Sequence, residues 1–573
     1  MSEAATIPPP VSEWKSGYRI LFRIAFIFFI LICIPNSAEW YDTVIHIDWT
    51  RLNYRDLYDI ARFGSGINIF GDKLFGSTLL GYANWIITLL IAVGGGLVWT
   101  FIVRRRHTER PEYNTLYYWL RTIVRYRAGI GIIGFGFTKL LPVQMPYPGY
   151  GLLNTDFGDF TAQKIFWLSV GIVPWYQVFA GIVEVAAGTL LFFRRTTALG
   201  AILLVGALGD IVYVNFAYDG GVHVYSSYFV LLAAFLLVDT VPKVYDLLIR
   251  ERPTTPTLYY PQLRPWLQYT RFGLKGLTLF LFLGVLFWLQ YVNFRYDPYK
   301  QPAVAGLKTL RGTYKVSEFR LNNHLIAYNP ADTLAWQEVE FERWSSLSFT
   351  VNKPHALDLS NGGGDPQRDV NRNFEITGVA GGRRVYHYYA DTIDKVLYLE
   401  DKFKELPDRR NRAAGVTERS EGYDRGGARD DAPPKVGDGT REANPQTESG
   451  ERQTASIAAP RKSRRSATTL DNGTEKTPKK PWDSWIPKEA QAHIGPEVAQ
   501  IDPHAASTRR DREYAQAKFE KRNRMILRYD TIDNGNRVIL SGVNENKDSV
   551  YIVLDRVARN YTLTESSLQA GKY

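Results

Sequence analysis

Six polar side chains stand in or beside long apolar stretches of the chain, where ionisable groups are rare and usually functional. They are Lys139, Glu184, Asp210, Asn215, Asp219 and His223. A lysine at membrane depth needs a counter-charge, so we expect Lys139 to neutralise Glu184 or Asp210. One interpretation is a single polar pocket that opens to the outer side and binds a ligand. The other is a buried lysine–carboxylate pair that only fixes helix packing.

Other patterns that carry catalysis are missing from the sequence. The chain has one cysteine, Cys33, which excludes a disulfide framework and a thiolate metal site. The histidines lack the spacing of metal ligands, and His223 is more typical of a membrane interface than of a metal site. The Gly-x-Gly-x-x-Gly run at 129–134 lies inside an apolar stretch, where small residues let helices pack closely. No enzymatic reaction is indicated.

Seven apolar segments are long enough, at roughly 20 residues, to cross a bilayer as helices. They occupy about 18–35, 79–103, 121–142, 174–193, 196–217, 222–241 and 272–292. The first could also be read as a signal peptide. We expect it to be kept as an anchor, because a long polar stretch precedes it and Ile-Leu-Ile-Cys is a poor lipoprotein site.

The Lys and Arg residues around these segments predict their orientation, since basic loops stay on the cytoplasmic side. Basic residues gather after the second segment and in the loops before the fifth and seventh, whereas loops 143–173 and 218–221 hold almost none. The exception is the outer loop 36–78, which contains Arg51, Arg55, Arg62 and Lys73. Seven crossings place the N-terminus inside and the C-terminal part outside. The net charge of +11 then reflects topology and predicts no nucleic-acid partner.

Beyond residue 296 the apolar pattern changes to the alternation of β-strands. Strands are expected at 310–321, 337–342, 346–352, 372–378, 383–390, 395–400, 525–530, 537–543 and 549–555. The Asp-Asn-Gly at 533–535 is a hairpin signal. Eight or nine short antiparallel strands predict a small barrel or sandwich. Its Gly-Thr-Tyr at 312–314, with Arg556, is similar to the lipocalin-like pattern, and both a side-chain-filled barrel and a ligand cup fit it.

The two strand sets are separated by 405–515, a polar segment with few aliphatic residues. Such a segment cannot bury enough apolar surface to fold, so we expect a disordered insertion. The predicted organisation has five parts. They are helices 1–2 with their outer loop (1–110), a four-helix unit (111–245), a linker with helix 7 (246–296), an extracytoplasmic β-domain (297–404 and 516–573) and the insertion (405–515).

The four-helix region resembles the DoxX-like family of small membrane proteins. The matching stretches are Gly-Phe-Thr-Lys-Leu-Leu-Pro (136–142), Pro-Trp-Tyr-Gln-Val-Phe-Ala-Gly-Ile-Val-Glu-Val-Ala-Ala-Gly (174–188), Arg-Arg-Thr-Thr-Ala-Leu-Gly (194–200) and Val-Asn-Phe-Ala-Tyr-Asp (214–219). The resemblance implies an all-helical polytopic fold in the bacterial cytoplasmic membrane. It also implies a link to quinone-dependent oxidation of small sulfur species, with quinone as the cofactor.

Three functions follow from these observations. Because the sequence has no flavin, haem or iron–sulfur motif, the role implied by the resemblance is that of an accessory component of an envelope redox system. The alternative is a non-catalytic envelope protein whose β-domain binds a protein partner or lipid. Transport of a small solute or proton ranks last, since the inner halves of helices 3–6 are poor in polar residues apart from Arg121, Arg125 and Arg127.

Overall fold

The protein was analysed as a computed structural model. The structure describes residues 13–63, 79–255, 259–359, 368–403, 485–505 and 522–559. Lys73 of the first outer loop lies outside these ranges, and so does the predicted disordered insertion except for 485–505.

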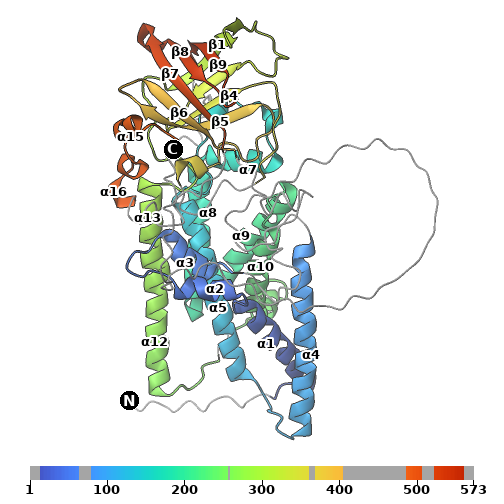
Figure 1. The fold of residues 1–573 in the computed structure, drawn as a ribbon. Helices are drawn as coiled ribbons and strands as arrows, with labels where there is room; N and C mark the ends of the chain where they lie inside the picture. The colour runs from blue at the N-terminus through green and yellow to red at the C-terminus, as the bar shows by residue number, and fades with distance from the viewer. Residues whose placement is uncertain are drawn as a thin grey trace, which may run out of the picture. The chain divides into compact units, whose positions relative to one another are not determined.

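Helices occupy the positions of all seven predicted apolar segments (Figure 1). They are α1 (Ser16–Cys33), α4 (Ala83–Arg105), α5 (Asn114–Leu140), α8 (Pro174–Leu191), α9 (Thr197–Ala217), α10 (His223–Leu237) and the continuous run of α12 (Pro265–Leu279), the π-helical turn η4 (Phe280–Val285) and α13 (Leu286–Tyr296). Shorter helices are α2 (Ala38–Ile45), α3 (Tyr54–Ala61), η1 (Leu79–Tyr82), α6 (Tyr150–Leu153), α7 (Ala162–Gly171), η3 (Arg194–Thr196) and α11 (Val241–Leu248).

Among the described residues, four helices are long and apolar enough on their own to cross a membrane. They are α1, α4, α9 with its preceding η3 turn, and the α12–α13 run. The bent pairs α7–α8 and α10–α11 raise the number to six if each pair forms one span. Helix α5 carries Arg121, Arg125, Arg127 and Lys139, which makes it too charged to be assigned by apolarity alone. Membrane insertion of several helices is therefore supported, whereas the number seven stays a prediction.

Helix α5 packs at the centre of the helical part. It contacts α8 and α10, and α9 lies against both, so that these four helices close into a ring. Their shared core is apolar and well buried, with Leu120, Val124, Ile132, Leu204 and Leu232 among its members. Burying such side chains stabilises a bundle through packing contacts, since lipid itself offers no hydrophobic driving force between helices.

The described part, residues 36–63, of the loop predicted to lie outside folds back onto the helices. Asn53 caps α3 in a capping box with Asp56, and α3 contacts both α5 and α13. The guanidinium groups of Arg55 and Arg62 lie 5.0 and 5.6 Å from the ring centre of Tyr58. These two basic residues therefore pack against protein, which gives a physical reason for basic residues in a loop that is predicted to lie outside.

The C-terminal part is a closed eight-stranded antiparallel β-barrel (Figure 1). Its strands are β1 (Gly312–Leu321), β3 (Glu338–Phe341), β4 (Ser346–Thr350), β5 (Arg383–Asp391), β6 (Val396–Asp401), β7 (Arg524–Ile532), β8 (Arg537–Val543) and β9 (Ser549–Val557), with the short β2 (His324–Leu325) added to β1. Neighbours in sequence pair throughout, and β1 pairs with β9 to close the barrel. Closure leaves no free sheet edge among these eight strands.

Large side chains fill the barrel interior. They form one core that includes Tyr314, Trp336, Phe341, Phe349, Tyr386, Tyr388, Leu527 and Leu540. The structure brings Arg556 to the Gly-Thr-Tyr pattern, where its guanidinium lies 4.8 Å from the Tyr314 ring centre. Arg556 also donates to the carbonyl oxygens of Arg311 (2.6 Å) and Gly535 (2.8 Å). Of the two expectations for the domain, the filled barrel is the one that the structure resembles.

One expectation for this domain was wrong. Residues 372–378 form no strand but a turn, and only Val379 makes an isolated bridge, to Phe160. Phe374 is buried by packing on Leu152, Trp167 and Leu168 of helical segments, and not within a sheet, and Ile376 is buried as well. Within the predicted insertion, the described residues 485–505 contain α15 (Lys488–Ile494), η6 (Glu497–Gln500) and α16 (Pro503–Ala505), and α15 contacts β5.

Candidate functional site

Small residues bring α5 and α8 into unusually close contact. A Cβ atom added at Gly181 would lie 2.2 Å from the Leu140 nitrogen and 2.8 Å from the Gly136 carbonyl oxygen. Two turns further along α8, a Cβ at Gly129 would lie 3.0 Å from the Gly188 carbonyl oxygen. Glycines are thus required for the approach of the two backbones, which agrees with the packing role expected for this glycine-rich stretch.

This close approach places two of the predicted site residues together. The Lys139 ammonium donates to the Glu184 carboxylate, and both residues are buried, with exposed fractions of 9% and 1%. On the same face of α8, Gln177 accepts from the Met145 N–H and donates to the Met145 carbonyl, both at 3.0 Å. Gln177 therefore fixes the chain that leaves α5 just after Lys139. The close contact of the two helix backbones and the hydrogen bonds of Gln177 therefore fix the positions of Lys139 and Glu184.

The other four predicted residues lie elsewhere on the bundle. Asn215 is buried at the end of α9, donating to the Ile211 carbonyl at 2.7 Å and accepting from the Val222 N–H. His223 is buried beside it, 3.3 Å from the Tyr82 hydroxyl, with its ring stacked on Phe216. Asp210 and Asp219 are exposed, and Asp219 adopts a positive φ of 50° in the α9–α10 turn. Lys139 pairs with Glu184 and not with Asp210.

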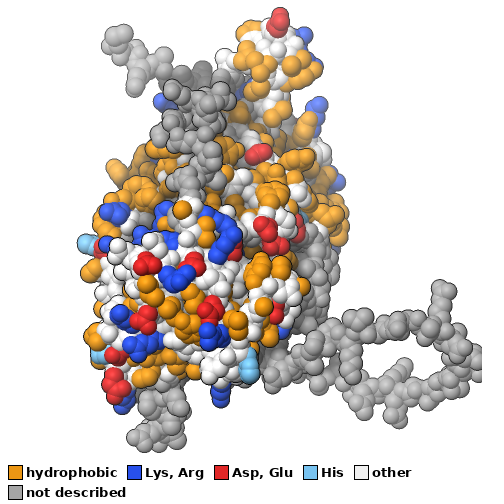
Figure 2. All heavy atoms as spheres, turned by 90° about the horizontal axis from the view of Figure 1, so that it is seen from above, with side chains coloured by type: hydrophobic (Ala, Val, Ile, Leu, Met, Phe, Trp, Pro, Cys, Tyr) orange, Lys and Arg blue, Asp and Glu red, His pale blue; other side chains and the backbone are white. Residues whose placement is uncertain are grey.

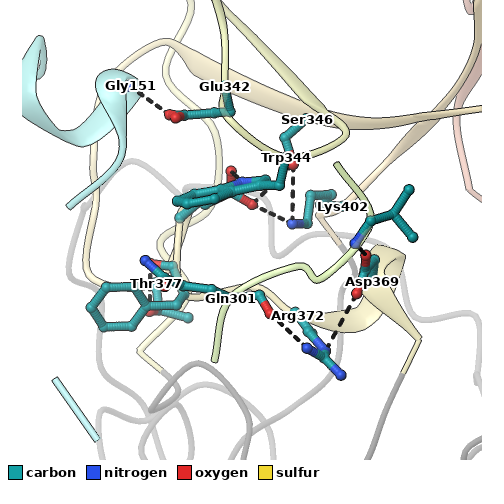
Figure 3. Close-up of polar contacts among 12 residues, drawn as sticks. Gly151, Gln301, Glu342, Trp344, Ser346, Asp369, Arg372, Thr377 and Lys402 are labelled. Atoms are coloured by element: carbon teal, nitrogen blue, oxygen red, sulfur yellow. Dashed lines mark hydrogen bonds and ion pairs between the residues drawn. The ribbon is translucent and has the colours of Figure 1, made fainter. Parts of the chain in front are cut away.

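A second cluster of buried charges lies where the loop after α5 meets the barrel. The Glu342 carboxylate, at the end of β3, accepts hydrogen bonds from the backbone N–H groups of Gly151 (2.8 Å) and Tyr150 (3.0 Å) (Figure 3). In the same loop, the Thr161 N–H donates to the Gly378 carbonyl at 3.0 Å, and the Ala380 N–H donates to the Asp159 carbonyl at 2.7 Å. The barrel is thus bonded directly to the loop 143–173.

The chain that leaves α13 is held by the same cluster. Arg372 is buried and pairs with Asp297 (2.6 Å) and Asp369 (3.5 Å), while donating to the Gln301 carbonyl at 2.6 Å (Figure 3). The Asp369 carboxylate in turn accepts from the N–H groups of Ala303 and Val304 at 2.9 and 2.8 Å. We call these contacts, together with those of Glu342, the junction cluster.

Three lysines complete the junction cluster. Lys402 is buried, pairs with Glu375 and lies 3.5 Å from the Ser346 hydroxyl, while Trp344 donates to Glu375 at 2.7 Å (Figure 3). The Lys164 ammonium donates to the Phe374 carbonyl and lies over that residue's ring. The Lys300 ammonium lies 3.5 Å from the Trp167 ring centre. Aromatic faces attract cations in this way when water is excluded.

Burial shifts the titration of groups in this cluster. Burial and the neighbouring charge of Glu375 raise the pKa of Glu342 to about 7, although the N–H groups of Gly151 and Tyr150 act in the opposite direction. Burial, assisted by the like charge of Lys164, holds the pKa of Lys300 well below its usual value. Shifted groups often mark functional sites, and structural ion-pair networks shift them too.

One group of side chains has the spacing of a metal site. Ligand atoms of Asp391, Asp394 and His493 lie within 4.8 Å of one another. The contacts in place are structural, because His493 already bonds to Asp391 at 2.9 Å and Asp391 also accepts from the backbone of Ile393 and Asp394. This pairing connects α15 with the end of β5.

The sequence did not identify the junction cluster as a site. Its members are ordinary charged residues in loops, and their partners lie far away along the chain, as with Gly151 and Glu342. One usable signal was the run of four charged residues, Arg368, Asp369, Arg372 and Glu375, inside a stretch whose apolar alternation suggested burial. Charged residues in a buried segment require partners of opposite charge, but those partners cannot be identified from a single sequence.

Comparisons with known proteins find similarity for only a small part of this chain. No family model matches it, and no solved structure matches it. Over 100 residues it is 34% identical to an uncharacterized protein, YwoB, of Bacillus subtilis (strain 168). That match covers 15% of this chain and 65% of the length of YwoB. The likeness is therefore local and carries no function with it.

Proposed function

We propose that this chain is a DoxX-like protein of the bacterial cytoplasmic membrane and an accessory component of a quinone-linked or sulfur redox system. In this proposal the N-terminus is cytoplasmic and the β-barrel is periplasmic. The observation that carries it is the buried Lys139–Glu184 pair, since both residues belong to the stretches on which the resemblance rests. A buried ion pair often stabilises a protein less than apolar side chains of the same size would. Its presence here therefore favours a functional site over inert packing.

The proposed orientation is supported from two directions. The loop 143–173, which the charge rule places outside, is bonded to the barrel through Glu342. The α12–α13 run carries Arg271 and Lys275 near its start, and its other end leads into the barrel. Since basic residues favour the cytoplasmic end of a helix, both features support an outer location of the barrel.

The experiment compares native-host membranes that contain the wild-type chain, no chain, or single variants. Quinone reduction is measured with thiosulfate or sulfide as the electron donor. We expect deletion of the chain to lower the rate, and Lys139→Met and Glu184→Gln to lower it at least tenfold. Asp210→Asn is the matched control, because Asp210 is an exposed acidic residue of the same helical unit, and it should leave the rate unchanged. Unchanged rates in the deletion, or in both pair variants at normal protein levels, would refute the proposal.

A second candidate role is supported by the barrel itself. Its interior is filled by side chains, so any partner must bind the outside. Three large apolar side chains of the β2 region are exposed there: Leu325 (65%), Tyr328 (74%) and Leu334 (55%). The face seen from above intersperses acidic, basic and hydrophobic side chains (Figure 2). If this role is the main one, Tyr328→Ser with Leu334→Ser abolishes function and partner co-purification, while the double variant Lys139→Met with Glu184→Gln preserves both.

A further inference from the structure

Five basic side chains converge at the end of the helical part that lies away from α13. Arg121 and Arg125 come from α5, Arg194 from the η3 turn between α8 and α9, and Arg271 and Lys275 from the first turns of α12. They are close enough to repel one another: Arg125 interacts with Arg121 and Arg194, Arg194 with Arg121 and Arg271, and Lys275 with Arg125 and Arg271. We call these five residues the basic cluster.

Aromatic rings, and not carboxylates, surround most of the basic cluster. The Arg194 guanidinium lies 3.7 Å from the Tyr260 ring centre and 5.2 Å from that of Tyr118. Arg271 donates to the Tyr118 hydroxyl at 3.3 Å, and the Lys275 ammonium lies 3.8 Å from the Phe193 ring centre. These contacts orient the cations without neutralising them.

A single carboxylate reaches the basic cluster among the described residues. Asp239 pairs with Arg121 at 3.2 Å, and it also accepts from the Tyr117 hydroxyl at 2.7 Å. The Asp239 side chain is 54% exposed, so water screens its attraction for more distant cations. Asp239 therefore neutralises at most the charge of Arg121. Four positive charges therefore remain without a counter-charge from the described part of the chain.

Arg125 shows this deficit most clearly. Arg125 is only 8% exposed, and its Nε atom is buried without a hydrogen-bond partner in the described structure. Its nearest favourable contact is the Tyr126 ring, whose centre lies 6.0 Å away. A guanidinium that is buried among like charges and makes no hydrogen bond is unfavourable unless an anion supplies both the charge and the acceptors.

We propose that the basic cluster binds the phosphate group of an anionic phospholipid. Phosphate fits because its oxygens accept several charge-assisted hydrogen bonds, and guanidinium forks match it well. The source is lipid because the cluster lies between α5 and α12, and α12 exposes Phe272, Leu274 and Leu277 directly beside its two cations, where acyl chains can pack. Basic pockets between membrane helices bind acidic headgroups in this way. The site is independent of the Lys139–Glu184 pair.

The test measures lipid retention by the purified full-length chain. The protein is reconstituted in nanodiscs of phosphatidylglycerol and phosphatidylcholine mixed in equal amounts, and lipids still bound after transfer to detergent are counted by native mass spectrometry. We expect at least tenfold more phosphatidylglycerol than phosphatidylcholine, and a fall of at least tenfold in Arg125→Gln with Lys275→Gln. The control is Arg195→Gln, an exposed arginine next to Arg194, which should not change retention.

Two results would overturn the proposal. One is equal retention of the two lipids by the wild-type chain, a measurement that remains decisive even if the double variant does not fold. The other is inorganic phosphate that binds the lipid-free protein and is lost in the double variant while no phosphatidylglycerol is retained, which would assign the cluster to a soluble anion instead.

Discussion

Among single residues, Lys139 and Glu184 depend on each other for their burial. Replacing one of them leaves the other as an uncompensated buried charge, which typically costs about 3–5 kcal/mol. We therefore expect Lys139→Met or Glu184→Gln alone to destabilise the bundle strongly, and the double variant to recover most of that loss. Thermal unfolding in detergent of the two single variants and the double variant measures this coupling. Additive effects would show that the two side chains do not act as a pair.

Glu342 makes the junction sensitive to pH. Its folded-state pKa of about 7 lies above the ordinary glutamate value of 4.5, so the folded protein holds this proton more tightly than the unfolded chain does. The stabilisation is full below pH 4.5 and is lost as the pH rises through 7. Glu342→Gln should reduce the change of the thermal unfolding midpoint with pH between pH 4.5 and pH 7. Burial lowers the pKa of His387 to about 4, which acts in the opposite direction, so the difference between variant and wild type is the quantity to measure.

If that difference does not vary between pH 5 and pH 8, Glu342 keeps an ordinary pKa and the account given for its shift is wrong. The pair Tyr150 and Gly151 offers an internal comparison, because their N–H groups bond to this carboxylate. Their protection from amide exchange, corrected for the intrinsic pH dependence of exchange, should change in the same pH window in the wild-type protein and should stay constant in Glu342→Gln.

Between elements, the contact of α5 with α8 depends on the absence of side chains. Gly181→Val would place a side chain where the Leu140 nitrogen lies 2.2 Å from the Cβ position, so the helices must separate. Overpacking of this kind typically costs about 1–3 kcal/mol, and here it should also break the Lys139–Glu184 pair. Gly206→Val on α9 is the matched control, since a Cβ there meets nothing within 4 Å. Thermal unfolding should separate the two variants, and equal midpoints would contradict the close approach.

At this same scale the sequence was most informative where the pattern was local. Apolar runs located the helices, and alternation located eight of the nine expected strands, because both signals depend on neighbouring residues. The prediction of a strand at 372–378 failed because Phe374 is buried against helical segments from far along the chain, and not within a sheet. Helix α15 was missed because its burial rests on few apolar residues, such as Ala490, within a polar segment.

For the whole molecule, the sequence placed the β-domain directly after helix 7, and the structure shows that it is also bonded to a second part of the helical region. The barrel is bonded both to the chain after α13, through Arg372, and to the loop between α5 and α8, through Glu342. No local pattern could indicate this, because each contact joins loops from distant parts of the sequence. Of the candidate site, the Lys139–Glu184 pair could be anticipated, since its residue types are exceptional in apolar segments, whereas the junction cluster could not.

The attachment of the barrel can be tested at Arg372, whose side chain is 1% exposed. Arg372→Met removes the ion pairs with Asp297 and Asp369 but leaves the barrel core untouched, because Arg372 lies outside it. We expect the barrel to stay folded while the chain 297–306 is released, since Asp369 loses the partner that orients it toward the N–H groups of Ala303 and Val304. Hydrogen exchange at these two amides should rise at least tenfold.

The matched control for this prediction is Arg537→Gln. Arg537 also pairs with an aspartate, Asp555 at 2.6 Å, but both side chains are largely exposed, at 49% and 40%. Exposed pairs contribute about 0–1 kcal/mol, so exchange at Ala303 and Val304 should not change. Barrel amides such as those of Leu527 and Leu540 should remain protected in both variants, because their side chains lie in the core. Faster exchange throughout the barrel in Arg372→Met would mean that the junction stabilises the domain itself, and unchanged exchange at 303 and 304 would mean that the buried ion pairs do not hold the barrel to the helices.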